Sequence, residues 1–196
     1  MAQGGSDDVL LAAAARGEEL AFMLLYERHR APLFRFLRRL CGSVELAEDV
    51  THDCFVGLIR RPSGFDSSRA SLRTYLCTVA RNLAFSRLRR EGRESSLDDL
   101  DAGPLRLVDE SPGPLEEMQS SELRGNVADA VARLPVLQRE AIILFEYEEF
   151  TLAEIAQVAG ADLWTIKSRL RRARASLRRS LSSQSSMPAN CAKEAV

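Results

Sequence analysis

Apolar side chains recur at intervals of three and four residues along two long stretches of the chain, 7–92 and 124–182. In the run 44–61, for example, Leu46, Val50 and Cys54 fall on one face of a helix with a period of 3.6 residues. Alternating β-branched runs and Asn-Gly turns, which signal strands and hairpins, are scarce. The pattern therefore predicts an all-α protein.

Glycine, proline and capping residues divide this pattern into separate helices. Gly17 and Gly42 are expected to end helices, and Pro32 is expected to start a new one. Thr151 is followed three residues later by Glu154, which is the spacing of a capping box at a helix start. These breaks predict several short helices in each half rather than a few long ones.

The segment between the two stretches has a different composition. Residues 94–123 contain nine acidic residues, one base (Arg106) and three prolines. Such a segment buries too little apolar surface to offset the entropy of folding. We therefore expect two small helical domains, 7–92 and 124–182, joined by a flexible acidic linker at 93–123, with a disordered polar tail at 183–196.

Composition argues against several classes of protein. No apolar run approaches the roughly 20 residues that span a bilayer, and the acidic N-terminal stretch lacks the basic start of a secretory signal. We therefore expect no membrane insertion and a cytoplasmic location. A glycine-rich phosphate loop is missing from the sequence, so a helical enzyme with a small-molecule substrate is disfavoured.

Four cysteines and two histidines are present, and no two cysteines form a CxxC pair. A zinc site cannot be assembled from this spacing, and no metal or other cofactor is expected. Cys41, Cys54 and Cys77 lie among apolar residues in helical patterns. Buried reduced thiols are the favoured interpretation, and a redox sensor is the alternative.

Charge is segregated along the chain, although the net charge is only −1. Seven arginines and one acid lie between Arg69 and Arg93, and seven basic residues and no acid lie between Trp164 and Arg179. Phosphate neutralisation dominates affinity for nucleic acids, so two basic helices suggest two separate contacts with DNA. The alternative is that both are solvated charged faces.

The second basic segment also has the length and composition of a helix-turn-helix, over residues 151–170. An inward stripe of Ile166, Leu170, Ala173 and Leu177 would turn Trp164, Ser168, Arg171, Arg172 and Ala175 outward. Arginines on that face suit guanine, whereas Lys167 and Arg174 on the flank suit phosphates. A plain helical hairpin is the alternative.

The expected helix at 44–61 has the opposite charge. Glu45, Glu48, Asp49 and Asp53 share its polar side. Such a surface repels DNA and suits a basic protein partner, although a simple solvated face explains it equally well.

Taken together, these segments resemble a known family. AEDVTHDCF, VARN and TIKSRLRRARASL, in that order, are similar to the sigma factors of the extracytoplasmic-function group of the sigma-70 family. The resemblance covers residues 7–92 (region 2) and 124–181 (region 4). It implies a transcription initiation factor without catalytic activity, whose partners are core RNA polymerase, promoter DNA and an anti-sigma factor.

The resemblance also implies a role for particular residues. Glu48, Asp49, His52 and Asp53 would bind core polymerase. The −10 element would contact Arg69, Arg73, Arg81, Asn82 and Arg89, and the −35 element would contact Trp164, Thr165, Lys167, Ser168, Arg171 and Arg172. The acidic linker would thread the polymerase channel towards the active site.

Three residues depart from the family's usual pattern. His52 stands where glutamine is frequent, Tyr75 where tryptophan is frequent, and Trp164 where glycine is common. Two placements of Trp164 remain open: its indole packs on a deoxyribose or thymine methyl, or it folds back on the turn beside Ala161.

Two other classes of function compete with this interpretation. A transcriptional regulator would use only the C-terminal helix-turn-helix and would bind its operator without polymerase. An interaction scaffold would bind proteins without directing them to promoters.

Overall fold

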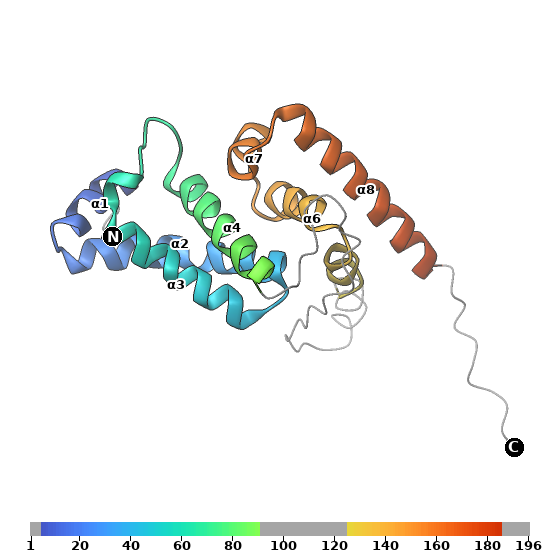
Figure 1. The fold of residues 1–196 in the computed structure, drawn as a ribbon, viewed down its shortest axis with the longest axis horizontal. Coiled ribbons are helices and arrows are strands. Elements are labelled where there is room, and N and C mark those ends of the chain that lie inside the picture. The colour runs from blue at the N-terminus through green and yellow to red at the C-terminus, as the bar shows by residue number, and fades with distance from the viewer. Residues whose placement is uncertain (1–4, 91–124, 186–196) are drawn as a thin grey trace, which may run out of the picture.

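The computed structural model describes residues 5–90 and 125–185, and every regular element within them is helical (Figure 1). The N-terminal half contains α1 (Asp7–Ala15), α2 (Glu19–Cys41), α3 (Val44–Arg60), the 3₁₀ turn η1 (Pro62–Gly64) and α4 (Leu72–Arg90). The C-terminal half contains a helix at 125–132, α6 (Val136–Ile142), the π-helical turn η2 (Ile143–Tyr147), α7 (Leu152–Ala159) and α8 (Leu163–Ser185). The all-α prediction is confirmed. Helix α8 runs to Ser185, so residues 183–185 of the predicted disordered tail are helical. The predicted linker and residues 186–196 of the predicted tail lie outside the described residues.

One predicted boundary is wrong, because α2 continues through Pro32 as a single 23-residue helix. Proline removes one helical hydrogen bond and normally kinks or ends a helix. Here the same helix face stays buried before and after the proline, from Leu25 to Leu33 and Phe36. Packing of this continuous stripe outweighs the local cost of the proline.

The N-terminal half is a bundle in which α2 packs against α1, α3 and α4. Gly42 adopts a left-handed conformation (φ 70°) at the end of α2, where a residue without a Cβ is favoured. The next residue, Ser43, caps α3, since its Oγ accepts a hydrogen bond from the Leu46 amide at 3.1 Å. The chain therefore reverses between α2 and α3 in a two-residue turn.

The C-terminal half contains the predicted helix-turn-helix. Thr151 and Glu154 form the reciprocal capping box that starts α7, and Gly160 ends α7 with φ 60°. Asp162 Oδ1 then accepts a hydrogen bond from the Thr165 amide at 2.7 Å, close to the start of α8. The local signals of the sequence thus fix both ends of the turn between the two helices.

The two halves share one hydrophobic cluster and pack against each other, which the sequence analysis did not predict. Helix α4 lies in the middle of the molecule, with α2 and α3 on one side and α7 on the other (Figure 1). Its buried side chains consequently fall on more than one face, including Leu72, Thr74 and Cys77. The basic helix of the N-terminal half is therefore a central element of the fold.

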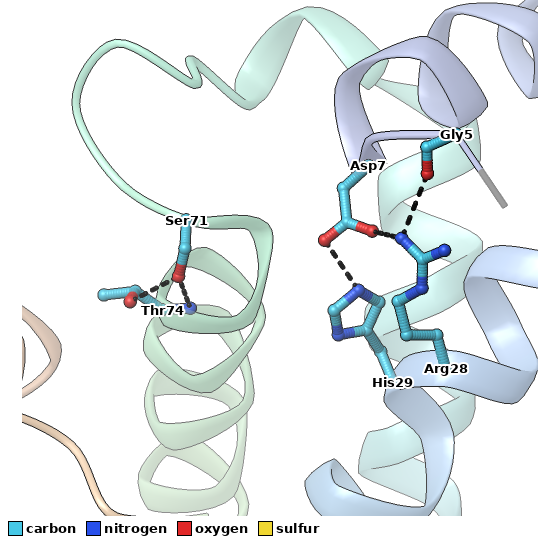
Figure 2. Close-up of polar contacts among 6 residues, drawn as sticks. All are labelled: Gly5, Asp7, Arg28, His29, Ser71 and Thr74. Atoms are coloured by element: carbon cyan, nitrogen blue, oxygen red, sulfur yellow. Dashed lines mark hydrogen bonds and ion pairs between the residues drawn. The ribbon is translucent and has the colours of Figure 1, made fainter. Parts of the chain in front are cut away.

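Helix α1 is tied to α2 by a polar cluster (Figure 2). Asp7 accepts a hydrogen bond from Arg28 and contacts His29 Nε2 at 2.9 Å. Burial lowers the pKa of His29 below its ordinary value of 6.5, although the Asp7 carboxylate opposes this shift. The folded protein therefore favours the neutral imidazole.

This shift predicts that acid weakens the fold. Below pH 6.5 the unfolded chain binds a proton at His29 that the folded chain resists, so the free energy of unfolding should fall as the pH drops through that window. Urea unfolding between pH 7.5 and 5.5 measures the slope. His29→Asn should show a shallower slope than the wild type, and equal slopes would contradict the prediction.

Candidate nucleic-acid interface

The outward face of α8 is open to solvent. Its inward stripe is buried at Ile166, Leu170 and Ala173. On the opposite side Arg171 and Arg172 are exposed and Ser168 is half-buried, and on the two flanks Lys167 is exposed and Thr165 half-buried. The structure therefore has the same buried stripe and the same two outward-facing arginines that the apolar spacing predicted for α8.

Trp164 stands on the first turn of α8 with 77% of its surface exposed. The neighbouring Leu163 is also largely exposed. The sequence left two placements of the indole open. Its exposure excludes the one in which the indole folds back on the turn beside Ala161. An apolar contact surface is thus presented beside the basic side chains.

Arg174, on the flank of α8, is engaged within the C-terminal half. Its Nη2 donates to Glu146 Oε1 at 2.8 Å, and its guanidinium lies 5.0 Å from the centre of the Phe145 ring. Lys167, on the same flank, is exposed. The lysine is therefore the more available of these two groups for a phosphate.

The basic residues of the first segment divide into two groups. Arg69, Asn82 and Arg89 are exposed, whereas Arg73 and Arg81 point into the contact with the C-terminal half. The Arg69 carbonyl accepts a hydrogen bond from Gln157 of α7 at 3.2 Å. The structure thus places these five residues along one segment: three are exposed, Arg73 keeps 40% of its side chain exposed, and Arg81 is largely covered at 15%.

Two buried carboxylates of the C-terminal half receive these arginines. Glu140 on α6 accepts a hydrogen bond from Arg81 Nε, and Glu148 accepts one from Arg73 Nη2 at 3.0 Å. Both glutamates are nearly inaccessible, at 1% and 4%. Burial raises the pKa of Glu140, although the positive charge and hydrogen bond of Arg81 oppose this shift.

A buried arginine crosses the contact in the other direction. Arg139 donates from Nη1 to the Leu40 carbonyl at 3.0 Å and from Nη2 to the Leu134 carbonyl at 3.0 Å. It therefore joins the end of α2 to the start of α6. Sequence reasoning missed this residue and both glutamates. The available signal was a pair of opposite charges, Arg139 and Glu140, between apolar residues and next to only one other polar side chain, Gln138.

The acidic face of α3 is partly neutralised by α4. Glu48, Asp49 and His52 are exposed, and Asp53 is half-buried. Arg87 forms ion pairs with both aspartates, and its Nη1 lies 3.4 Å from Asp49 Oδ2. Two of the four residues expected to bind polymerase therefore also hold α3 and α4 together.

An apolar groove of about 520 Å³ adjoins this face, between α1, α2 and α3. Phe22, Tyr26 and Phe55 line it, and His52 stands at the border between the groove and the acidic face. Nearby on α2, Leu20 and Met23 are exposed. The surface combines apolar and acidic groups, as protein-binding surfaces commonly do.

The three cysteines that the structure describes are buried thiols, as the favoured interpretation held. Burial raises the pKa of Cys54 and of Cys77 to about 12. In residues 5–90 and 125–185 no group of histidine, cysteine and acidic side chains is arranged to hold a metal ion. Over the same residues, none of the helices has the length and apolarity needed to cross a bilayer.

A thiol with a pKa near 12 is ionised to about one part in ten thousand at pH 8, so it reacts slowly. In a variant with Cys41→Ser and Cys191→Ser we expect the two remaining thiols, Cys54 and Cys77, to react with Ellman's reagent on the order of a thousandfold more slowly than in urea. Absorbance at 412 nm measures the rate. A fast-reacting thiol in the folded protein would support the redox-sensor alternative instead.

The capped helix-turn-helix, the open basic face of α8 and the second basic helix define a helical DNA-binding protein. Comparison with known sequences identifies its family. Residues 25–94 match sigma-70 region 2, and residues 124–177 match sigma-70 region 4. The chain is 34% identical to the ECF RNA polymerase sigma factor RpoE of Cereibacter sphaeroides, over 90% of this chain and 96% of that one.

Other relatives agree. The ECF sigma factor SigK of Mycolicibacterium vanbaalenii is 30% identical over 89% of this chain and 88% of its own length. SigW of Bacillus subtilis is 27% identical over 85% and 91% of the two chains. The chain therefore belongs to the extracytoplasmic-function group of the sigma-70 family of RNA polymerase sigma factors.

Solved structures show the same fold. The sigma factor RpoE of Bartonella quintana, in complex with the anti-sigma factor NepR, superposes with a TM-score of 0.65 at 27% identity, covering 82% of this chain and 96% of that one. CnrH, in complex with the cytosolic domain of CnrY, gives a TM-score of 0.64 over 91% and 99% of the two chains. At 24% identity, CnrH supports the fold alone.

Proposed function

We propose that this chain binds core RNA polymerase in the cytoplasm and directs it to promoters through a −10 and a −35 element, without a catalytic step of its own. The observation that carries the proposal is the open basic face of α8, presented by a capped helix-turn-helix. A recognition helix placed in this way enters the major groove with its first turns against base edges.

Each basic or acidic surface receives one role in this proposal. Helix α8 reads the −35 element through Trp164, Thr165, Lys167, Ser168, Arg171 and Arg172. Helix α4 and the residues before it bind the −10 element through Arg69, Arg73, Arg81, Asn82 and Arg89. The acidic face of α3 binds core polymerase through Glu48, Asp49, His52 and Asp53.

Regulation by an anti-sigma factor is part of the proposal. The Bartonella quintana RpoE, which has the same fold, was solved with the anti-sigma factor NepR. The apolar groove beside α3 offers this chain a surface of the kind that a partner helix occupies. An anti-sigma factor bound there would lie beside the acidic face and would compete with polymerase.

Dependence on polymerase tests the main proposal. With core enzyme, the chain should start transcription from one class of promoter in a randomised library, and alone it should bind duplex DNA weakly. Tight binding of the isolated chain to a defined operator in physiological salt would instead favour a regulator. Failure to start transcription from any promoter would favour an interaction scaffold.

The acidic face is best tested at Glu48, because Asp49 and Asp53 also hold Arg87. Glu48→Lys should weaken binding to core polymerase by about tenfold or more, since like charges placed across an interface cost up to several kcal/mol. Glu27→Lys, an equally exposed change on α2, is the matched control. Fluorescence titration with core enzyme gives both affinities, and equal affinities would move the docking surface elsewhere.

The recognition helix gives a separate prediction. Arg171→Ala and Arg172→Ala should each cost about 1–3 kcal/mol on the preferred −35 sequence and relax the preference at one base pair. Lys167→Ala should weaken all sequences alike and lower the slope of log affinity against log salt by about 0.9. Selections on a randomised −35 element with holoenzyme separate the two effects. If both arginine variants keep the parental preference, another face of α8 enters the groove.

A further inference from the structure

Trp164 is the only tryptophan of the chain, and it stands on the first turn of α8 with 77% of its surface in solvent. Large aromatic side chains dominate the energetics of contact surfaces, because each can bury about 150–250 Å². An indole left in solvent makes no use of this area within the folded chain. The position of Trp164 on α8 indicates what covers it.

Trp164 belongs to the face of α8 that points away from the core. Trp164, Ser168, Arg171 and Ala175 follow one another at intervals of four, three and four residues, which places them on one face of a helix. Side chains of a helix lean towards its N-terminus, so the indole projects over the start of α8. The first turns of a recognition helix reach base edges in the major groove. Trp164 therefore stands where bases are contacted.

The start of α8 is poorly suited to a phosphate. Asp162 Oδ1 accepts a hydrogen bond from the Thr165 amide at 2.7 Å, and this hydrogen bond lowers the pKa of Asp162 below its ordinary value. The amides at a helix start commonly bind anions, and here a carboxylate of the chain itself takes that place. Its negative charge also repels the DNA backbone. Basic residues of α8 begin only at Lys167, so the first turn favours an uncharged part of the DNA.

The base edges of the major groove differ in what they offer an indole. Guanine, adenine and cytosine present hydrogen-bonding groups there, whereas thymine also presents its 5-methyl group. Polar groups covered by an apolar ring lose their water without gaining a partner. The one polar atom of the indole, Nε1, is a donor and cannot pair with the amino groups of adenine and cytosine. Thymine is therefore the base whose edge best suits this ring.

We propose that Trp164 reads a thymine of the −35 element, with the indole packed on the 5-methyl group of that base. The inference rests on the proposed function, which places α8 on the −35 element. Trp164 is then a specificity determinant of a different kind from Arg171 and Arg172. The arginines recognise a hydrogen-bonding pattern, whereas the indole recognises a hydrophobic group.

Replacement of thymine by uracil isolates this contact. Uracil lacks the 5-methyl group and keeps the hydrogen-bonding groups of thymine. Burial of one methyl-sized apolar group changes an affinity by about fourfold. Uracil at the contacted position should therefore weaken binding by about fourfold, and only while the indole is present.

The test uses the full-length chain assembled with core RNA polymerase. Selection on a randomised −35 element gives the preferred duplex, and each thymine of that element, on either strand, is then replaced by uracil in turn. Competition binding at fixed salt measures the affinity of the wild type, Trp164→Ala and Trp164→Phe. Leu163→Ala is the matched control, because Leu163 is an exposed apolar neighbour that shares the flank of Lys167 rather than the face of Trp164.

At one position uracil should cost the wild type and Leu163→Ala about fourfold, Trp164→Phe less, and Trp164→Ala nothing. A selected element without thymine, or a wild-type affinity that no uracil changes, overturns the inference. An equal loss in the wild type and Trp164→Ala also overturns it, because another residue then reads the methyl group. Transcription from the selected promoter is scored in parallel. Transcription without a uracil effect overturns this inference alone, whereas a wild-type holoenzyme that starts no transcription overturns the proposed function.

Discussion

Much of this structure depends on the burial of Glu140 and Glu148 against arginines of the other half. A carboxylate at 1% or 4% exposure is tolerated only when partners replace its lost water. Those partners lie on α2 and α4, so the C-terminal half keeps its position only while it faces these two helices. The apolar part of the contact is less directional. The charges therefore fix the orientation of the halves, whereas the hydrophobic cluster supplies most of the burial.

Helix α4 is in contact with helices of both halves. It packs against α2 and α3 through side chains such as Leu76 and Ala80, and against α7 on another side. A helix buried on several sides has no single apolar stripe, and its arginines must find acids or exposed positions. Arg87 forms an ion pair with Asp53 on α3, Arg81 forms one with Glu140, and Arg89 is exposed to solvent. Helix α4 thus contributes to the core, forms an ion pair with the C-terminal half and also presents exposed basic side chains.

The sequence predicted what local patterns control. The capping box at Thr151 and the inward stripe of α8 follow from spacing within a few residues, and the structure has both. The continuation of α2 through Pro32 could not be predicted from residues near the proline, because it depends on packing along the whole helix. The ion pair of Arg81 with Glu140 joins positions 59 residues apart, and no local periodicity encodes such a partner.

The π-helical turn η2 sets the direction of Glu148. Its amide donates to the carbonyl of Ile143, five residues earlier, at 3.1 Å. A turn of this kind holds one residue more than an α-helical turn, and each residue of a helix adds about 100° of rotation. If the same residues formed a regular α-helix, Tyr147 would pair with the Ile143 carbonyl and Glu148 would stand about 100° further round the helix, away from Arg73. The contact of Glu148 with Arg73 therefore depends on the π-helical hydrogen bonding of this turn as well as on the charges themselves.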